Sequence, residues 1–283
     1  MTGRKNEMSS LEYDGERIVP GKTVELLFRE SQVRYGFAGR FAKGNVVLDI
    51  ASGAGIGTHY LLQAGATRCF GFDLSLAAVQ YAKSSYAGCE FAVCNATGLC
   101  LADDSVDFVV SFETIEHLAD PRTFLSECER VLRPNGVLLS STPNREISRW
   151  GPPNPFHLSE MTPDEFLSLM QEYFVGCRLY GQGSVGYLSC VAKSIIVNLL
   201  EGMRLRSLVR RSLRRFMPHT VGGICIETEF SELNGRYPQL AISPYRSQWN
   251  RRPAYLLAMG QKPGGSRRDE TRVKDRLAEG VRS

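Results

Sequence analysis

The chain has 283 residues, of which 43% are hydrophobic and 23% are charged. This composition is ordinary for a globular protein, and the length suffices for one large domain or for a domain with an insertion. The formal net charge of +4 is too small to indicate a nucleic-acid partner by itself.

No apolar stretch reaches the roughly 20 residues of a membrane-spanning helix. Residues 1–10 are polar, so we also expect no secretion signal. None of the 8 cysteines forms a C-x-x-C pair, which argues against a zinc ribbon. We interpret the cysteines as small buried hydrophobic residues, which indicates a reducing, cytoplasmic setting.

The first regular element predicted is a helix over about residues 23–36, and a buried strand follows at Val46–Ile50. After the strand, Gly53, Gly55 and Gly57 stand two residues apart. A turn of this kind reaches unusual dihedral angles and lies close against a ligand, and the amides at the start of the next helix point toward that ligand.

The spacing of these glycines differs from that of a dinucleotide site, which has the pattern G-x-G-x-x-G. Here the third glycine, Gly57, comes one residue early, and an acid, Asp49, stands at the end of the strand. A negative charge there suits a cationic ligand better than a phosphate. A second predicted strand ends at Asp73, where an acid can accept both hydroxyls of a ribose.

Strands and helices then alternate with short connections, which predicts a parallel α/β sheet. Three helices begin at residues that make good N-terminal caps, namely Ser75, Asp120 and Thr162. The later strands are predicted at residues 90–94, 106–112, 137–141, 177–181 and 254–259. A helix is predicted to end at Pro134–Gly136, because this Pro-Asn-Gly sequence cannot continue it.

Residues from about 20 to 182 resemble the nucleotide-binding half of the class I S-adenosylmethionine-dependent methyltransferases. The matching segments, in order, are residues 49–57, Asp73, 107–113, 131–136 and 138–143. The resemblance implies a doubly wound, Rossmann-like, mostly parallel seven-stranded sheet with an antiparallel edge strand, assigned to Tyr255–Leu257, and a helical insertion. The alternative is a doubly wound domain whose glycines only form a tight turn.

The resemblance also implies S-adenosylmethionine as the cofactor. The implied cofactor-binding residues are Tyr35, Asp49, Ala51, Gly53, Gly55, Asp73, Leu74, Asn95, Ala96 and Phe112. The family usually has an acid at the position of Asn95, and an asparagine oxygen can still accept a hydrogen bond from adenine. A leading helix often covers the cofactor in this family, so Arg34 is a further candidate contact; a surface arginine is the alternative.

Candidate catalytic residues follow the fourth strand, where open α/β sheets place their ligand crevice. They are Glu113, Glu116 and His117, which converge if the segment turns helically. His157, in a proline-rich loop, can reach the same crevice. Two carboxylates and two imidazoles suit magnesium, manganese or zinc. The alternatives are that His117 is a metal-free base, or that the Glu-His pair is structural.

The set of Glu113, Glu116, His117 and His157 resembles the Glu-x-x-Glu-His motif and distant histidine of small-RNA 2′-O-methyltransferases; ubiquinone-pathway O-methyltransferases share the Glu-x-x-Glu-His segment. The first functional hypothesis is O-methylation of a sugar, a glycan precursor, also when carrier-linked, or another natural product. RNA ribose methylation is the alternative, against which the small net charge and the absence of an RNA-binding module count. A third hypothesis is a non-catalytic, membrane-peripheral protein that binds S-adenosylmethionine.

The predicted organisation has five parts: a flexible segment 1–20, the cofactor-binding core 21–182, an insertion 183–252, a final core strand 253–263 and a disordered tail 264–283. Arginines crowd residues 204–215 with apolar residues between them, which predicts a basic amphipathic helix. Residues 185–216 are therefore a candidate for contact with an anionic membrane surface or with the diphosphate of a carrier-linked substrate. A solvated helix face is the alternative.

Overall fold

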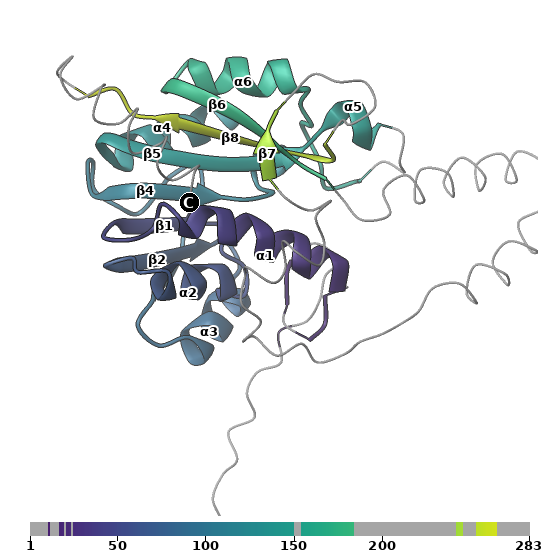
Figure 1. The fold of residues 1–283 in the computed structure, drawn as a ribbon. Coiled ribbons are helices and arrows are strands. Elements are labelled where there is room, and N and C mark those ends of the chain that lie inside the picture. Colours follow the sequence, from purple (N-terminus) through teal and green to yellow (C-terminus); the bar gives the residue numbers. More distant parts are fainter. Residues whose placement is uncertain are drawn as a thin grey trace, which may run out of the picture.

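The computed structural model describes residues 11, 17–19, 21–23, 25–149, 154–183, 242–245 and 253–264. They form a central eight-stranded sheet with helices on both faces (Figure 1). The strands are β1 (Val46–Ile50), β2 (Arg68–Asp73), β3 (Glu90–Val93), β4 (Val106–Ser111), β5 (Leu132–Pro143), β6 (Val175–Gln182), β7 (Ile242–Pro244) and β8 (Tyr255–Gln261). The helices are α1 (Glu25–Gly39), α2 (Ile56–Gln63), α3 (Leu76–Ser85), the 3-10 turn η1 (Ile115–His117), α4 (Pro121–Val131), α5 (Arg145–Ser148) and α6 (Pro163–Gln171).

The strand order is β3-β2-β1-β4-β5-β8-β6-β7. The strands β1 to β5 are parallel to their neighbours, whereas β8 runs antiparallel to both β5 and β6. The predicted Rossmann-like, mostly parallel sheet is therefore confirmed, with 8 strands rather than seven.

The antiparallel edge strand exists, but it is β7, which pairs with β6. The assignment of the edge to Tyr255–Leu257 was wrong, because these residues lie in β8, between β5 and β6. A strand's residues reveal that it is buried, but they do not reveal which neighbours it inserts between. Because β7 falls inside residues 183–252, the segment predicted as an insertion supplies a strand to the core sheet.

Residues 185–216 and the tail from residue 265 lie outside the described residues, so the predictions of a basic helix, a membrane contact and a disordered tail stay predictions. Of the segment predicted as flexible, Leu11 and Val19 are described, and both are buried against Ala54 and Ala78. No helix in the described part of the chain is long and apolar enough to cross a membrane.

Apolar side chains of the central strands alternate between two core layers. Along β4, Phe108 and Val110 pack in the layer that contains residues of α1 and α2, whereas Val109 packs in the layer that contains residues of α4 and α6. Successive residues of a strand point to opposite faces, so both faces of the sheet are covered and β4 is buried on both sides.

The predicted helix starts are confirmed by side-chain caps. Asp120 Oδ1 accepts hydrogen bonds from the amides of Arg122 at 3.0 Å and Thr123 at 3.2 Å, and Thr162 begins α6 with a full capping box. The prediction that the helix starting after Asp120 ends at Pro134–Gly136 was wrong. Helix α4 ends at Val131, because Leu132 already pairs with Val106 across an irregularity in the sheet.

Candidate functional site

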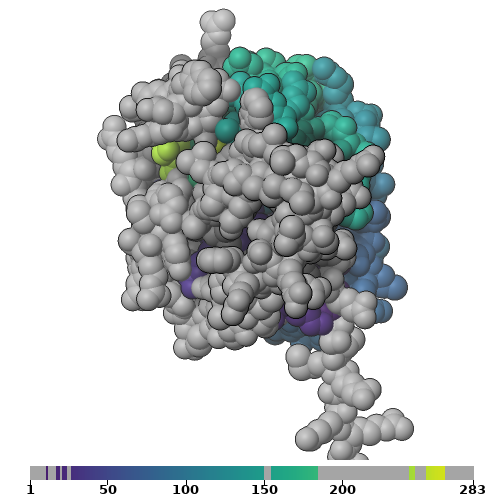
Figure 2. Space-filling view, turned by 90° about the vertical axis from the view of Figure 1, so that its right-hand side faces the viewer, coloured from purple at the N-terminus to yellow at the C-terminus, as the bar shows by residue number. Residues whose placement is uncertain are grey.

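The sheet order reverses between β1 and β4, which is the point where open α/β sheets bind their ligands. The carboxyl ends of these strands face the side of the molecule that carries α5, since α5 directly follows β5. Figure 2 looks onto that side and shows surface from the purple N-terminal part and from the teal residues after β5 on one face. The candidate cofactor contacts after β1 and β2 and the candidate catalytic residues after β4 both lie at this end of the sheet.

Asp49, at the end of β1, is fully buried, with both carboxylate oxygens engaged. The Tyr35 hydroxyl lies 3.1 Å from Oδ1 and 3.2 Å from Oδ2, and the Thr58 hydroxyl donates to Oδ2 at 2.7 Å. Burial raises the pKa of Asp49 to about 7, although these two hydrogen bonds oppose the shift. Ionising Asp49 in the ligand-free chain is therefore unfavourable, and a bound cation would favour the ionised form.

Gly57 explains how Tyr35 reaches Asp49. A Cβ atom added to Gly57 would lie 1.9 Å from the Tyr35 Cζ atom, so the ring occupies the space that a side chain would need. The ring edge also packs on Phe112, with the ring centroids 5.0 Å apart. The third glycine of the motif therefore makes room for an aromatic ring of the chain itself.

Asp73, at the end of β2, is held by two backbone amides. Gly53 donates to Oδ2 and Ser75 donates to Oδ1, each at 2.8 Å. Each oxygen keeps a lone pair for a further donor, as ribose binding needs. The next residue, Leu74, is 73% exposed and lies open to a ligand beside Asp73.

The remaining predicted cofactor contacts lie in the neighbouring turns. Ala51 has a positive φ of 57° and Gly55 one of 81°, which shape the turn after β1. Ala96 packs partly buried on the core. The Asn95 oxygen, expected to bind adenine, already accepts from the amide and the hydroxyl of Thr97, both at 3.0 Å. An adenine amino group would have to share this oxygen.

Glu113 is turned toward β5 rather than along η1. Its backbone has a φ of 51°, in the left-handed region. The Ser141 hydroxyl donates to Glu113 Oε1 at 2.6 Å and accepts from the Glu113 amide at 3.1 Å. Ser141 on β5 therefore holds the Glu113 carboxylate, whose charge still reaches Glu116 and raises the pKa of that carboxyl.

Glu116 is fully buried, and neither carboxylate oxygen has a hydrogen-bond partner among the described residues. Burial raises its pKa well above the ordinary range, and the charge of Glu113 adds to the shift. Thr142 and the charge of Arg34 oppose this rise in pKa. Among the described residues the Thr142 hydroxyl has no partner with hydrogen-bond geometry, so its contact with Glu116 is not a formed hydrogen bond. A buried carboxyl group without a hydrogen-bond partner is unfavourable for folding and indicates a group kept for a ligand.

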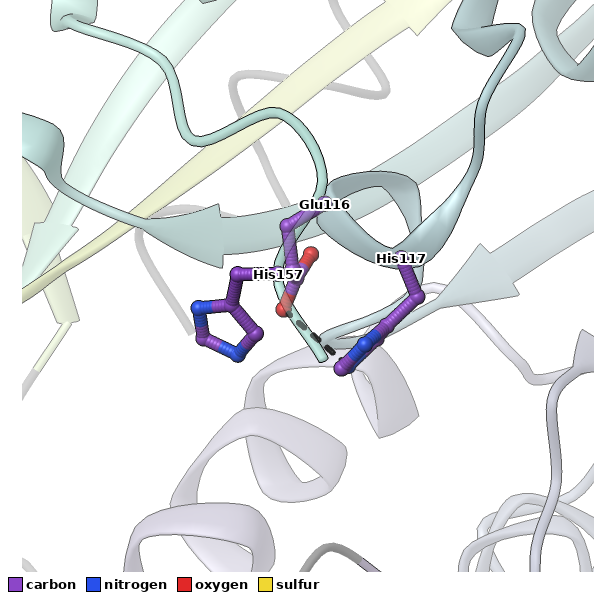
Figure 3. Close-up of side chains that lie close together, drawn as sticks. All are labelled: Glu116, His117 and His157. Carbon is purple, nitrogen blue, oxygen red and sulfur yellow. Dashed lines mark ion pairs between the residues drawn. The ribbon is translucent and has the colours of Figure 1, made fainter. Parts of the chain in front are cut away.

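Two histidines flank Glu116, and Figure 3 shows the three side chains directed toward one another. His117 Nδ1 lies 3.0 Å from the Phe156 carbonyl oxygen, which can only accept, so Nδ1 carries the proton in the neutral ring. His117 Nε2 then presents its lone pair 3.9 Å from Glu116 Oε1. The His157 ring lies 5.0 Å from the His117 ring, centre to centre.

The loop that carries His157 is tied down by its own polar network. His157 Nδ1 lies 2.5 Å from Glu160 Oε1, and its Nε2 lies 2.8 Å from the Asn154 amide nitrogen. The amides of Leu158 and Ser159 donate to the Glu116 carbonyl at 2.7 and 3.0 Å. The loop is therefore fixed to η1 by its backbone, and His157 is held within the loop by Asn154 and Glu160.

Donor atoms of Glu116, His117 and His157 all lie within 4.8 Å of one another. Glu113 is not part of this group, since its carboxylate bonds to Ser141. Sequence reasoning missed Thr58, Asn154 and Glu160, which orient Asp49 and His157. Only Thr58 left a sequence signal, because it stands in the first turn of the helix after the glycine motif.

Comparisons with known proteins point to methyltransferases. Residues 48–140 match the family model of the methyltransferase domain. A probable S-adenosylmethionine-dependent methyltransferase of Mycolicibacterium smegmatis is 40% identical over 167 residues, which make up 58% of this chain and 65% of that protein. A ubiquinone biosynthesis O-methyltransferase of Cereibacter sphaeroides is 29% identical over 148 residues, 46% of this chain and 60% of that protein. The chain thus matches less than two thirds of the length of these curated relatives.

Among solved structures, the chain is similar to a Thermotoga maritima S-adenosylmethionine-dependent methyltransferase described as a possible histamine N-methyltransferase. The TM-score is 0.54 at 15% identity, over 83% of this chain and 92% of that one, which shows a shared fold. Residues 48–140 thus match a methyltransferase domain within a Rossmann-like sheet, in a chain that is similar to S-adenosylmethionine-dependent methyltransferases.

Proposed function

We propose that this protein transfers a methyl group from S-adenosylmethionine to a hydroxyl oxygen of a sugar, a glycan precursor or another natural product, with His117 as the general base. The observation that carries the proposal is the fixed tautomer of His117. The Phe156 carbonyl holds Nδ1 as the protonated nitrogen, so Nε2 is the basic nitrogen and lies beside Glu116, just after the end of β4. An amine acceptor has less need of such a base than a hydroxyl does.

The chain's own residues have two tasks in this reaction. Asp49, Asp73 and the glycine turn hold the donor, whose methyl group is already activated by the positive sulfur, and alignment with a nucleophile contributes about 7–11 kcal/mol. As the bond from the acceptor oxygen to the methyl carbon forms, the bond from carbon to sulfur breaks. His117 Nε2 takes the hydroxyl proton, a step that contributes roughly 10²–10⁴-fold.

The proposal is tested by product analysis with a labelled donor. Purified protein is incubated with S-[methyl-13C]adenosylmethionine and a panel of glycosides, sugar phosphates, catechols and primary amines. The expected product is a 13C-labelled methyl ether, identified by the carbon chemical shift of its methyl group. Labelled N-methyl products, with no methyl ether formed from any hydroxyl acceptor, would overturn the proposal.

A divalent cation is a second proposal for the same residues, and the donor set fits it. Histidines that bind metals usually donate their other ring N–H to a carbonyl or a carboxylate. Here His117 is oriented by the Phe156 carbonyl and His157 by the Glu160 carboxylate. Glu116, His117 and His157 would hold the ion, which would polarise the acceptor hydroxyl. Asn154 occupies His157 Nε2 and would have to move aside.

We expect the chain to bind one Mn²⁺ or Zn²⁺ ion in calorimetric titrations after chelator treatment. Glu160→Gln should weaken binding by about 10–100-fold, because it loosens a histidine that the ion needs. His59→Ala is the matched control, since His59 lies on α2, stacks on Tyr86 and is not one of the three candidate ligands. No saturable uptake by the unaltered protein, or equal weakening by both substitutions, would remove the metal from the mechanism.

The raised pKa of Asp49 predicts how donor affinity depends on pH. With a pKa of about 7 in the ligand-free chain, Asp49 is mostly protonated at pH 6 and mostly ionised at pH 8. A cationic donor needs the ionised form, so affinity for S-adenosylhomocysteine, which keeps the ammonium group, should rise on the order of tenfold from pH 6 to pH 8. Calorimetry at the two pH values measures this ratio.

The raised pKa of Asp49 has the opposite effect on the stability of the ligand-free chain, which should fall as the pH rises. Because the folded pKa of Asp49 lies above the unfolded value of 3.8, its contribution to stability is present below that value and is lost as the pH rises toward about 7. Asp49→Asn is the control for both effects. If this variant keeps the tenfold change in affinity, the pH dependence comes from another group.

A further inference from the structure

Two cysteines contact each other in the segment that follows β3. Cys94 is buried directly after the strand, and its Sγ accepts a hydrogen bond from the Cys100 amide at 3.1 Å. The side chains of the two residues also share a hydrogen bond. Among the described cysteines Cys100 is the exposed one, so the interpretation of the cysteines as buried hydrophobic residues is wrong for it. The pair therefore consists of one accessible thiol and one protected thiol in contact.

The turn between the two thiols is the one from which an adenine contact is expected. The Cys94 thiol lies 3.5 Å from the main-chain carbonyl oxygen of Gly98 and 3.7 Å from that of Asn95, and it donates to them. The Gly98 amide closes the turn by donating to the Asn95 carbonyl at 3.1 Å. The buried thiol thus holds the turn that carries Asn95 and Ala96, the candidate cofactor contacts after β3.

Both ends of this segment are held by other parts of the fold. At its start, the Cys94 amide donates to the Asp73 carbonyl at the end of β2, at 3.1 Å. Near its end, the Leu99 amide donates to Glu127 Oε2 on α4 at 2.7 Å, and the Leu99 carbonyl accepts from Arg130 Nη2 at 2.9 Å. A change in how the two sulfur atoms are joined is therefore taken up by the turn between them, and not by β3 or α4.

We propose that Cys94 and Cys100 are an oxidisable pair, which hydrogen peroxide converts to a disulfide that weakens binding of the methyl donor, whichever acceptor is methylated. The Cys100 thiolate attacks a peroxide oxygen, the O–O bond breaks, and a sulfenic acid and water result. The Cys94 sulfur then attacks the sulfenic sulfur, so that an S–S bond forms, the S–O bond breaks and a second water leaves with the Cys94 proton. The two thiols lose two electrons, and one peroxide is reduced to two waters.

The surroundings of the two thiols decide the order of these steps and their effect. Burial and the hydrogen bond with Cys100 raise the pKa of the Cys94 thiol to about 11, so Cys94 keeps its proton at neutral pH and the exposed Cys100 reacts first. A disulfide has a narrow geometry and no thiol hydrogen. The Gly98 carbonyl then loses its donor, and the turn rearranges. Because Asn95 and Ala96 move with the turn, the oxidised chain should bind the donor less tightly.

Peptide mapping decides whether the disulfide forms. The full reduced chain is treated with hydrogen peroxide, the remaining thiols are blocked with N-ethylmaleimide, and the unfolded chain is digested with chymotrypsin, which cleaves after Phe91 and Leu99 and so separates the two cysteines. We expect a peptide pair that joins Cys94 to Cys100 and that dithiothreitol releases. Blocked thiols at both residues, or a disulfide from Cys100 to any other cysteine, would overturn the proposal.

Calorimetry with S-adenosylhomocysteine measures the effect on donor binding. The oxidised chain should bind about 2–10-fold more weakly than the reduced chain, which is the range for one lost hydrogen bond. Cys100→Ser should keep the affinity of the reduced chain before and after peroxide treatment. Cys177→Ser, which removes a half-buried thiol on β6, is the matched control and should respond to peroxide as the unaltered chain does. Equal affinities of the oxidised and reduced unaltered chain contradict the proposal.

Thermodynamic linkage supplies a check that needs no substitution. At a fixed ratio of reduced to oxidised glutathione, saturating S-adenosylhomocysteine should lower the ratio of disulfide to dithiol by the same factor by which oxidation weakens binding. A disulfide ratio that the ligand leaves unchanged speaks against the proposal. Failure of the reduced chain to bind S-adenosylhomocysteine at all would instead refute the proposed function, and the peptide map would still decide whether the disulfide forms.

Discussion

Alanine in place of His117 is expected to lower kcat by about 10²–10⁴-fold, the range contributed by a positioned general base. Affinity for S-adenosylhomocysteine should stay within about twofold, because a residue that acts only in the transition state changes the rate and not the binding of the donor. The reason is geometric: His117 Nε2 faces Glu116 and its Nδ1 lies against the Phe156 carbonyl, at the end of β4 and not at the glycine turn after β1.

Two matched measurements decide this prediction. His59→Ala removes another histidine, one that stacks on Tyr86, and it should leave both kcat and affinity unchanged. The 13C-labelled methyl ether expected from the unaltered protein supplies the assay for kcat. A large loss of S-adenosylhomocysteine affinity in His117→Ala would mean that the residue belongs to the donor site.

Local sequence patterns predicted the parts of the fold that depend on short-range chemistry. The caps at Asp120 and Thr162 were predictable because a short polar side chain bonds to amides two or three residues ahead. Asp49 and Asp73 were predictable because each ends an apolar strand. The position of β8 was not, since sheet order depends on pairing between β5 and β6 across distant segments.

In the candidate site, too, local features were predictable from the sequence and contacts between distant segments were not. The proximity of Glu116 to His117 follows from their being neighbours in the chain. The sequence placed Glu113 with them, but it did not predict the left-handed backbone at Glu113 or the hydrogen bond from the distant hydroxyl of Ser141 that holds its carboxylate. The burial of Arg34 between Gln182 and Tyr255 emerges only when three segments far apart in the chain are folded together.

Gly57 gives a second prediction with a large effect, because its role is steric. Gly57→Ala should lower the free energy of unfolding by about 1–3 kcal/mol, the usual cost of overpacking. The new methyl group would lie 1.9 Å from Tyr35 Cζ, so the ring must leave its place and its hydroxyl must leave Asp49. Urea denaturation of the ligand-free chain measures the change.

The sign of this effect should reverse when Tyr35 is removed. In a Tyr35→Ala background no ring opposes the methyl group, and alanine is a better helix former than glycine by up to about 1 kcal/mol, so Gly57→Ala should stabilise α2. Tyr35→Phe separates the lost hydroxyl from the clash, since it keeps the ring. If Gly57→Ala destabilises both backgrounds equally, the two substitutions are independent, and the third glycine of the motif is required by the ligand or the turn and not by Tyr35.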